Sequence, residues 1–200
     1  VFPWHWSVCR WLPGQSAAAA PPNDPVETAR TLATFVAALH VPAPADAPVN
    51  EFRGVALQQR AAAVEQRVAA MGAGVDAARV LAVWAELSAT PPWPGPPLWL
   101  HGDLHPSNML TLDGRLSAVI DFGDITSGDP ATDMAVAWML FPPAERALFR
   151  PIAAIDALTW RRAAGWAPHL APAYLTGHDR TPLPAPRRTP RAPRRPALGC

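Results

Sequence analysis

Two polar segments of this chain flank a pair of short apolar runs, and this arrangement limits how the second half can fold. The apolar runs are Met109 to Leu112 and Leu116 to Ile120, and Asp113-Gly114 lies between them. An Asp-Gly pair between two such runs predicts a β-hairpin, because the tight turns of hairpins need positive φ angles. The hairpin would bring the polar segment 101–108, which precedes it, close to the polar segment 121–129, which follows it.

The polar segments contain the residue types that phosphoryl transfer requires. One carboxylate accepts or orients the proton of the attacking hydroxyl, while an amide and a second carboxylate hold Mg²⁺ against the nucleotide phosphates. Asn108 lies just before the first strand of the hairpin and Asp121 just after the second. We therefore expect the turn to place both hard oxygen ligands at the same end. Asp103 lies on the loop that leads into the hairpin.

The remainder of the chain predicts a mainly helical domain. Asn23 or Asp24 can cap a helix that begins with Pro25, carries Leu32 on its apolar stripe and ends near residue 40. Further helices are expected over about 55–71, about 76–88, from 129–130 through 140, and from 142 to about 175. The aromatic and β-branched residues of 4–12 predict a strand.

Composition places the chain in a broad class. Its 200 residues correspond to about one domain, and half of them are hydrophobic, as in globular proteins. No apolar run approaches the roughly 18 residues of a spanning helix, so no membrane partner is expected. The first residues lack the pattern of a signal peptide. Cys9 and Cys200 are too few for a disulfide framework, which favours a reducing, cytoplasmic setting.

The near-neutral net charge conceals an uneven distribution. All 17 basic residues are arginine; residues 180–200 carry a charge of +6 and residues 1–179 a charge of −5. The Pro- and Arg-rich segment 179–200 has no periodicity and is expected to be disordered. A charge run of this kind is weak evidence for nucleic-acid binding, and no nucleic-acid partner is expected. The acidic body favours a cationic small-molecule substrate.

The two polar segments resemble a known family. The order H-x-D-x-x-x-x-N followed by D-F-G is that of the kinase superfamily. The variants here, H-G-D-L-H-P-S-N at 101–108, I-D-F-G-D at 120–124 and G-D-P-x-x-D at 128–133, resemble the aminoglycoside phosphotransferase family. The resemblance covers roughly residues 4–175.

The resemblance implies an α+β fold with the architecture of the large, C-terminal lobe of protein kinases. This lobe is mainly helical, has a short catalytic hairpin, and would stand here with the N-terminal small lobe largely missing. Residues 1–14 would then be the last small-lobe strand and a hinge-like segment, residues 15–178 the large lobe, and residues 179–200 the tail.

The resemblance also implies roles for individual residues. Asp103 would be the catalytic base, and Asn108 and Asp121 would be the ligands of Mg²⁺. His101 would brace the catalytic loop, and Asp133 would anchor this loop from the following helix.

Further residues are assigned supporting roles. Backbone groups near Trp11 and Leu12 would meet the adenine of ATP. We expect His105 to shape the loop and Asp124 to assist the metal or face solvent. Four other histidines, His5, His40, His169 and His178, are expected to be structural or exposed.

The expected function is transfer of the γ-phosphoryl group of ATP to a hydroxyl of a small molecule. The family's small lobe carries a lysine that pairs with the phosphates, and this chain contains none. The expectation is therefore a truncated copy with impaired activity. One alternative is a catalytically dead fragment or small-molecule binding module. Another is a zinc metallohydrolase that uses His101, Asp103 and His105. The unpaired apolar strand expected at 4–12 predicts self-association.

Overall fold

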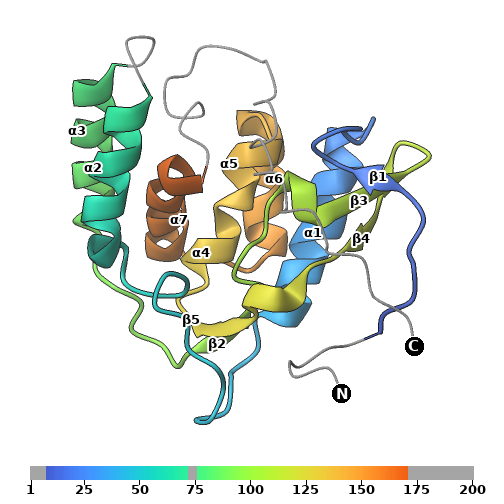
Figure 1. Ribbon diagram of the computed structural model, residues 1–200, viewed down its shortest axis with the longest axis horizontal. Coiled ribbons are helices and arrows are strands. Elements are labelled where there is room, and N and C mark those ends of the chain that lie inside the picture. Colours follow the sequence, from blue (N-terminus) through green and yellow to red (C-terminus); the bar gives the residue numbers. More distant parts are fainter. Residues whose placement is uncertain (1–7, 72–75, 171–200) are drawn as a thin grey trace, which may run out of the picture.

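Two small antiparallel sheets lie among the helices of the protein (Figure 1). The structure, a computed structural model, describes residues 8–71 and 76–170. The first sheet has the order β1-β3-β4 and consists of β1 (Gln15–Ser16), β3 (Met109–Leu112) and β4 (Arg115–Val119). The second pairs β2 (Leu98–Leu100) with β5 (Thr126–Gly128). Both sheets border the segment 101–108.

The strands β3 and β4 form the expected hairpin. Asp113 and Gly114 have φ angles of 51° and 75°, so both residues adopt the left-handed conformation of a tight hairpin turn. Met109 pairs with Val119, and the Ile120 N–H donates to the Asn108 carbonyl at 2.9 Å. The hairpin prediction is confirmed, and the pairing brings the residues that precede β3 beside those that follow β4.

The helices of the first half begin and end close to the expected positions. Helix α1 (Pro25–Leu39) starts at an Asp24 cap, whose Oδ1 accepts a hydrogen bond from the Glu27 N–H at 2.9 Å. The second expected helix opens as a 3-10 turn, η1 (Leu57–Arg60), and continues as α2 (Ala61–Ala70). Helix α3 (Ala77–Ser88) follows.

The second half contains four helices and two short 3-10 turns among the described residues: η3 (Pro106–Asn108), η4 (Phe122–Asp124), α4 (Ala131–Met134), α5 (Val136–Leu140), α6 (Pro143–Ile152) and α7 (Ala157–Leu170). The helix expected through residue 140 is interrupted at Ala135, between α4 and α5. Residues 171–175, the expected end of the last helix, lie outside the described residues.

The strand expected over residues 4–12 is wrong in its described part. Residues 8–13 have no regular structure, and Trp11 is 88% exposed. The strand lies further along, at Gln15–Ser16, because only this pair runs alongside β3, with Gln15 opposite Thr111. Residues 4–7 lie outside the described part of the chain.

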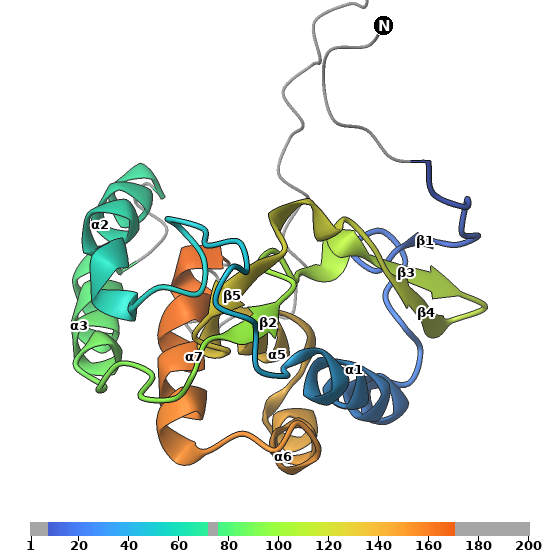
Figure 2. The ribbon, with the colours of Figure 1, turned by 90° about the horizontal axis from the view of Figure 1, so that it is seen from below.

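Helix α7 joins the parts of the domain. It contacts α2 and α3 on one side and α4 and α5 on the other, and α1 packs against α6 (Figures 1 and 2). Large apolar side chains from helices, strands and the loop at Leu104 are fully buried in the core: Leu32, Leu57, Leu100, Leu104, Met109, Met134, Phe149 and Trp166. Within the described ranges, no helix combines the length and apolar character that crossing a membrane requires.

One buried ion pair ties α7 to the residues that precede α4. The Arg162 Nε lies 2.6 Å from the Asp129 Oδ2, and the two side chains are 1% and 4% exposed. Arg162 also donates to the Pro91 carbonyl at 3.0 Å. Burial raises the pKa of Asp129, whereas the hydrogen bond from Arg162 lowers it. The carboxylate therefore depends on Arg162 for its charged state.

We predict that Arg162→Ala lowers the free energy of unfolding by about 3–5 kcal/mol, because it leaves Asp129 buried without its cation. Urea unfolding followed by circular dichroism measures the change. The matched control is Arg161→Ala, which removes an exposed pair with Glu86 and should cost less than about 1 kcal/mol. Equal losses in the two variants would contradict the assignment.

Candidate active site

A buried carboxylate on α4 holds the backbone of the segment 101–104 by hydrogen bonds. Asp133 is fully buried, and its two oxygens accept hydrogen bonds from the backbone N–H groups of His101 at 2.8 Å and Gly102 at 3.0 Å. His40, at the end of α1, places its Nε2 3.1 Å from the Asp133 Oδ2. A buried carboxylate is stable only when such donors replace water, so this cluster fixes the loop backbone.

His101 connects the loop to the end of the hairpin. Its Nδ1 accepts from the Asp103 N–H at 3.2 Å, so its Nε2 carries the proton and donates to the Ile120 carbonyl at 3.0 Å. Its ring packs 4.6 Å from the Phe122 ring, centroid to centroid. His101 is fully buried, and it links the loop that carries Asp103 to the segment that carries Asp121.

Three side chains surround the Asp103 carboxylate. The Arg53 Nη2 lies 3.0 Å from Oδ1, and His105 Nε2 and Asn108 Nδ2 each lie 3.2 Å from Oδ2. The hydrogen bond from His105, with the charge of Arg53 and its hydrogen bond, lowers the pKa of Asp103 to about 2, although partial burial acts in the opposite direction. Asp103 is therefore ionised at neutral pH.

His105 also sets the local backbone. Its Nδ1 accepts a hydrogen bond from the Ser107 N–H at 3.2 Å, which caps η3 and leaves the proton on Nε2, facing Asp103. One imidazole thus shapes the turn and orients the carboxylate.

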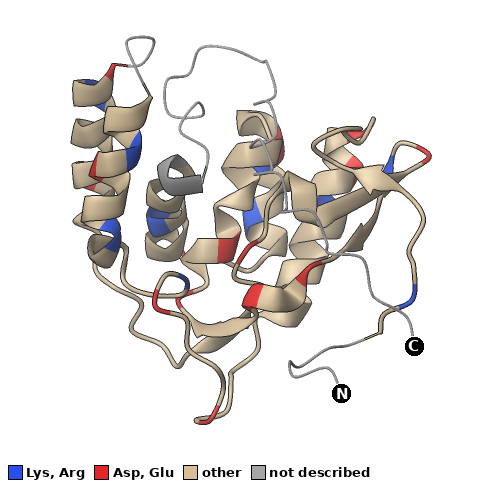
Figure 3. Cartoon of the chain, in the orientation of Figure 1, with Lys and Arg blue, Asp and Glu red and all other residues tan. Residues whose placement is uncertain are grey.

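Asn108 and Asp121 present oxygen atoms at the same end of the hairpin. The Asn108 amide nitrogen donates to the Asp103 carbonyl at 2.9 Å, which leaves the amide oxygen as its remaining ligand atom. Asp121 is exposed, and its backbone adopts the left-handed conformation with φ 64°. A non-glycine residue in this region is uncommon, and such outliers concentrate at functional sites. Acidic positions on η4 and α4 lie beside this loop (Figure 3).

Comparison with known proteins identifies the family of this chain. The family model described as "Phosphotransferase enzyme family" matches residues 1–166. The chain belongs to this phosphotransferase family. The resemblance to the aminoglycoside phosphotransferases is thereby confirmed, as is the mixed helical fold with a short hairpin.

Solved structures of phosphotransferases share the fold. The macrolide 2'-phosphotransferase MphH from Brachybacterium faecium is 25% identical with a TM-score of 0.52, and the alignment covers 84% of this chain and 64% of that one. An aminoglycoside-3'-phosphotransferase of type VIII is 23% identical with a TM-score of 0.53, covering 78% and 66%. The GDP complex of aminoglycoside 2'-phosphotransferase-IIIa is 20% identical with a TM-score of 0.56, covering 84% and 62%.

The chain spans less than two thirds of the length of each of these three phosphotransferases. The latter two, at 23% and 20% identity, show a likeness of fold alone. A search of the curated proteins finds no match.

The alternative of a zinc site formed by His101, Asp103 and His105 does not fit the structure. Both ring nitrogens of His101 are already engaged by backbone groups, and His105 is held by Asp103 and Ser107. Within the described ranges, no group of three or more His, Cys, Asp or Glu side chains is arranged to hold a metal ion. The alternation of His101, Asp103 and His105 therefore serves the loop itself.

Three residues singled out in the sequence lie apart from this cluster. Trp11 and Leu12 are exposed in irregular chain just before β1. Asp124 ends η4 and is exposed. No described contact joins these three side chains to Asp103, so their assigned roles stay predictions.

Sequence reasoning missed one contributor to the site, Arg53, and gave His40 no specific partner. Arg53 had no signal, because it stands in an irregular, Pro-rich stretch fifty positions before Asp103. His40 was expected to be structural or exposed, and the structure places it in the buried cluster around Asp133. Only the tertiary fold brings either residue to the loop.

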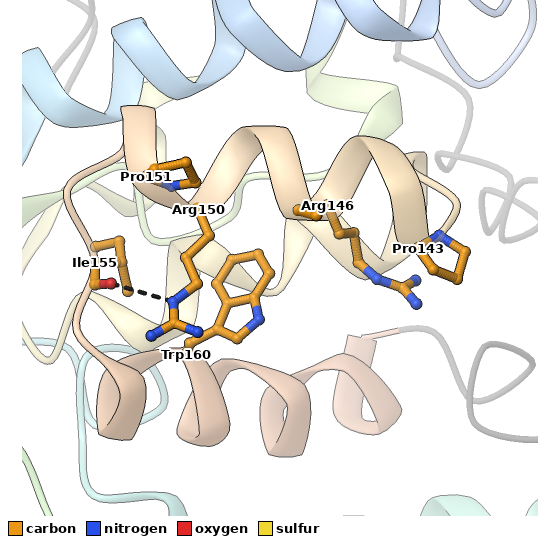
Figure 4. Close-up of a pocket in the computed structure, with 7 residues that line it drawn as sticks. Pro143, Arg146, Arg150, Pro151, Ile155 and Trp160 are labelled. Atoms are coloured by element: carbon orange, nitrogen blue, oxygen red, sulfur yellow. Dashed lines mark hydrogen bonds between the residues drawn. The ribbon is translucent and has the colours of Figure 1, made fainter.

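A separate cavity lies between α6 and α7 (Figure 4). It has a volume of about 600 Å³ and is lined by Pro143, Arg146, Ala147, Arg150, Pro151, Ile155 and Trp160. Arg146 donates to the Phe141 carbonyl at 3.0 Å and Arg150 to the Ile155 carbonyl at 3.4 Å. The cavity shares no residue with the cluster around Asp103.

The low pKa of Asp103 predicts a pH-dependent contribution to stability. Because the folded-state pKa, about 2, lies below the ordinary value of 3.8, the ionised carboxylate stabilises the fold above about pH 4. This contribution is lost as the pH falls from about 4 toward 2. We predict that the difference in unfolding free energy between wild type and Asp103→Asn is constant from about pH 7 to 5 and then shrinks.

Urea denaturation in metal-free buffer at a series of pH values measures this difference. Asp113→Asn, at the exposed turn of the hairpin, is the matched control. A wild-type advantage over Asp103→Asn that persists undiminished at about pH 3 would contradict the assignment.

Proposed function

We propose that this chain carries the phosphoryl-transfer site of an ATP-dependent phosphotransferase that acts on a hydroxyl group of a small molecule. The observation that carries the proposal is the ionised Asp103 beside Asn108, at the end of the hairpin from which Asp121 also extends. Membership of the phosphotransferase family supports the reaction class.

Asp103 would accept a hydrogen bond from the acceptor hydroxyl and orient its oxygen toward the γ-phosphorus. A carboxylate with a pKa of about 2 is a weak base, so it would take the proton only late in the reaction. This fits a loose transition state, in which catalysis consists mostly of positioning and charge stabilisation. His105 and Arg53 would keep the carboxylate in place during the transfer.

The oxygens of Asn108 and Asp121 fit Mg²⁺, which takes hard oxygen ligands and keeps several waters or phosphate oxygens in its shell. Two protein ligands are therefore sufficient for such a site. When bound, Mg²⁺ would neutralise negative charge on the nucleotide phosphates. The hydrogen bonds from the Asn108 amide nitrogen would turn its oxygen toward the metal.

The nucleotide would be ATP, with its adenine near the backbone of Trp11 and Leu12. Residues 15–18 run beside 106–111, so the segment that contains Trp11 leads directly to the hairpin. A relative with the same fold has been solved as its GDP complex, so GTP is the appropriate second donor to assay.

The positive charge of Arg53 beside Asp103 influences which acceptor molecules can bind there. The overall acidic charge of residues 1–179 favours a cation, but the nearest side chain from the α1–α2 connection is Arg53. The guanidinium of Arg53 disfavours a highly charged polycation close to Asp103. Macrolides and neutral polyols therefore belong in the acceptor panel beside aminoglycosides.

We predict that Asp103→Asn lowers the rate of phosphoryl transfer by about 10²- to 10⁴-fold, because the acceptor hydroxyl loses its anionic partner. Asp121→Asn should lower both the rate and the Mg²⁺-dependent affinity for ATP. Transfer of ³²P from ATP or GTP to the acceptor panel measures the rate. Asp113→Asn is the matched control and should keep the wild-type rate.

A second function is favoured by the absence of lysine from all 200 residues. The chain would then bind a small hydroxyl compound without transferring phosphate. Isothermal titration separates the two: a phosphotransferase binds ATP only with Mg²⁺ and loses this binding in Asp121→Asn, whereas a pure binding module shows neither. Wild-type transfer rates in Asp103→Asn would refute the proposed reaction.

A further inference from the structure

We propose that Arg53 is a positioning residue for Asp103, supplied to the catalytic loop by the segment that connects α1 and α2. The inference rests on the proposed function, because the orientation of Asp103 matters to phosphoryl transfer. Its starting observation is the ion pair between Arg53 Nη2 and Asp103 Oδ1 at 3.0 Å, with side chains 16% and 27% exposed.

The two oxygens of Asp103 are held in different ways. Oδ2 is bound by His105 and Asn108, which belong to the same loop. Within residues 8–71 and 76–170, Arg53 provides the hydrogen bond to Oδ1. Without Arg53 the carboxylate is fixed at a single oxygen and can turn about its terminal torsion, which has a broad energy minimum. Arg53 therefore determines the plane of the carboxylate and leaves a lone pair on Oδ1 for a hydroxyl.

The backbone beside Arg53 is fixed to the start of α4. The Gly54 N–H donates to the Thr132 hydroxyl at 3.0 Å, and the Gly54 carbonyl accepts from the Asp129 N–H at 2.8 Å. Gly54 has a φ angle of +68°, and a Cβ on Gly128 would lie 2.2 Å from the Gly54 carbonyl oxygen. Such a close approach of two backbones requires glycine at both positions.

A second anchor precedes Arg53 along the same segment. The Pro48 carbonyl accepts from the Ser127 N–H at 2.9 Å and from the Thr126 and Ser127 hydroxyls at 3.1 Å each. The segment thus runs beside β5, as Figure 2 shows, and is tied to β5 before Arg53 and to the start of α4 after it. Because the backbone is held on both sides of Arg53, only the arginine side chain has to be ordered when the ion pair forms.

The segments that carry Arg53 and Asp103 are both hydrogen-bonded to one short stretch of chain, residues 129–133. Asp133 holds the loop of Asp103, and Asp129 and Thr132 hold the backbone of Gly54, next to Arg53. The five consecutive residues 129–133 therefore help to fix the position of both the guanidinium and the carboxylate. A contact that positions a side chain requires such shared support, whereas a chance ion pair on the surface lacks it.

Two variants and a control test the role. Arg53→Ala removes the guanidinium, and Arg53→Lys keeps the charge without the planar fork. Arg79→Ala removes an exposed arginine of α3, outside the site.

Crystal structures of the wild type and of Arg53→Ala show whether the carboxylate moves. We expect the Asp103 carboxylate to rotate in Arg53→Ala, while the hydrogen bonds from His101 and Gly102 to Asp133 remain. An Asp103 side chain in its wild-type orientation would overturn the proposal.

Kinetics provide the second measurement. We expect Arg53→Ala to lower kcat by about 10- to 100-fold with little change in the KM of the acceptor, because orientation and not binding is lost. Arg53→Lys should recover part of the rate, and millimolar guanidinium chloride should raise the rate of Arg53→Ala but not of Arg79→Ala. An unchanged kcat in Arg53→Ala would refute the positioning role. If the wild type transfers no phosphate from ATP or GTP, the proposed function fails, and the crystallographic comparison still decides whether Arg53 holds Asp103.

Discussion

The buried carboxylate of Asp133 is the contact on which the geometry of the site depends. It accepts two backbone hydrogen bonds from the loop of Asp103 and lies 3.1 Å from His40 at the end of α1. A carboxyl group without access to water is tolerated only with such hydrogen-bond partners, so the loop cannot leave α4 without leaving buried polar atoms unpaired. His101, whose backbone Asp133 holds, donates a hydrogen bond from its ring to the Ile120 carbonyl, next to Asp121. The position of the loop is therefore linked to the position of Asp121.

The segment 129–133 extends the same principle to the rest of the site. Asp133 binds the loop of Asp103, Thr132 and Asp129 bind the backbone at Gly54, and Asp129 pairs with Arg162 of α7. A few polar residues at the start of α4 thereby connect the loop, the α1–α2 connection and the helix that joins the halves of the domain. The surrounding helices bury these contacts and exclude water from them, which strengthens each hydrogen bond.

The sequence predicts those parts of the structure that local signals determine. The Asp113-Gly114 turn and the Asp24 cap of α1 were predictable because their conformations depend on residues within a few positions. The strand expected over residues 4–12 was wrong from Val8 onward, because aromatic content does not specify a pairing partner and β3 pairs with Gln15. Arg53 could not be found, since its contact with Asp103 exists only after the chain between them has folded. The division of residues 1–14 and 179–200 from the main lobe stays a prediction.

The most direct test of the account is a crystal structure of this chain grown with Mg²⁺ and a non-hydrolysable ATP analogue. We expect the Asn108 amide oxygen and the Asp121 carboxylate to hold Mg²⁺ beside the nucleotide phosphates. The account also predicts that Asp103 is not a ligand and remains paired with Arg53 and His105. A nucleotide bound elsewhere on the chain, or a metal held by Asp103 instead of Asn108 and Asp121, would contradict it.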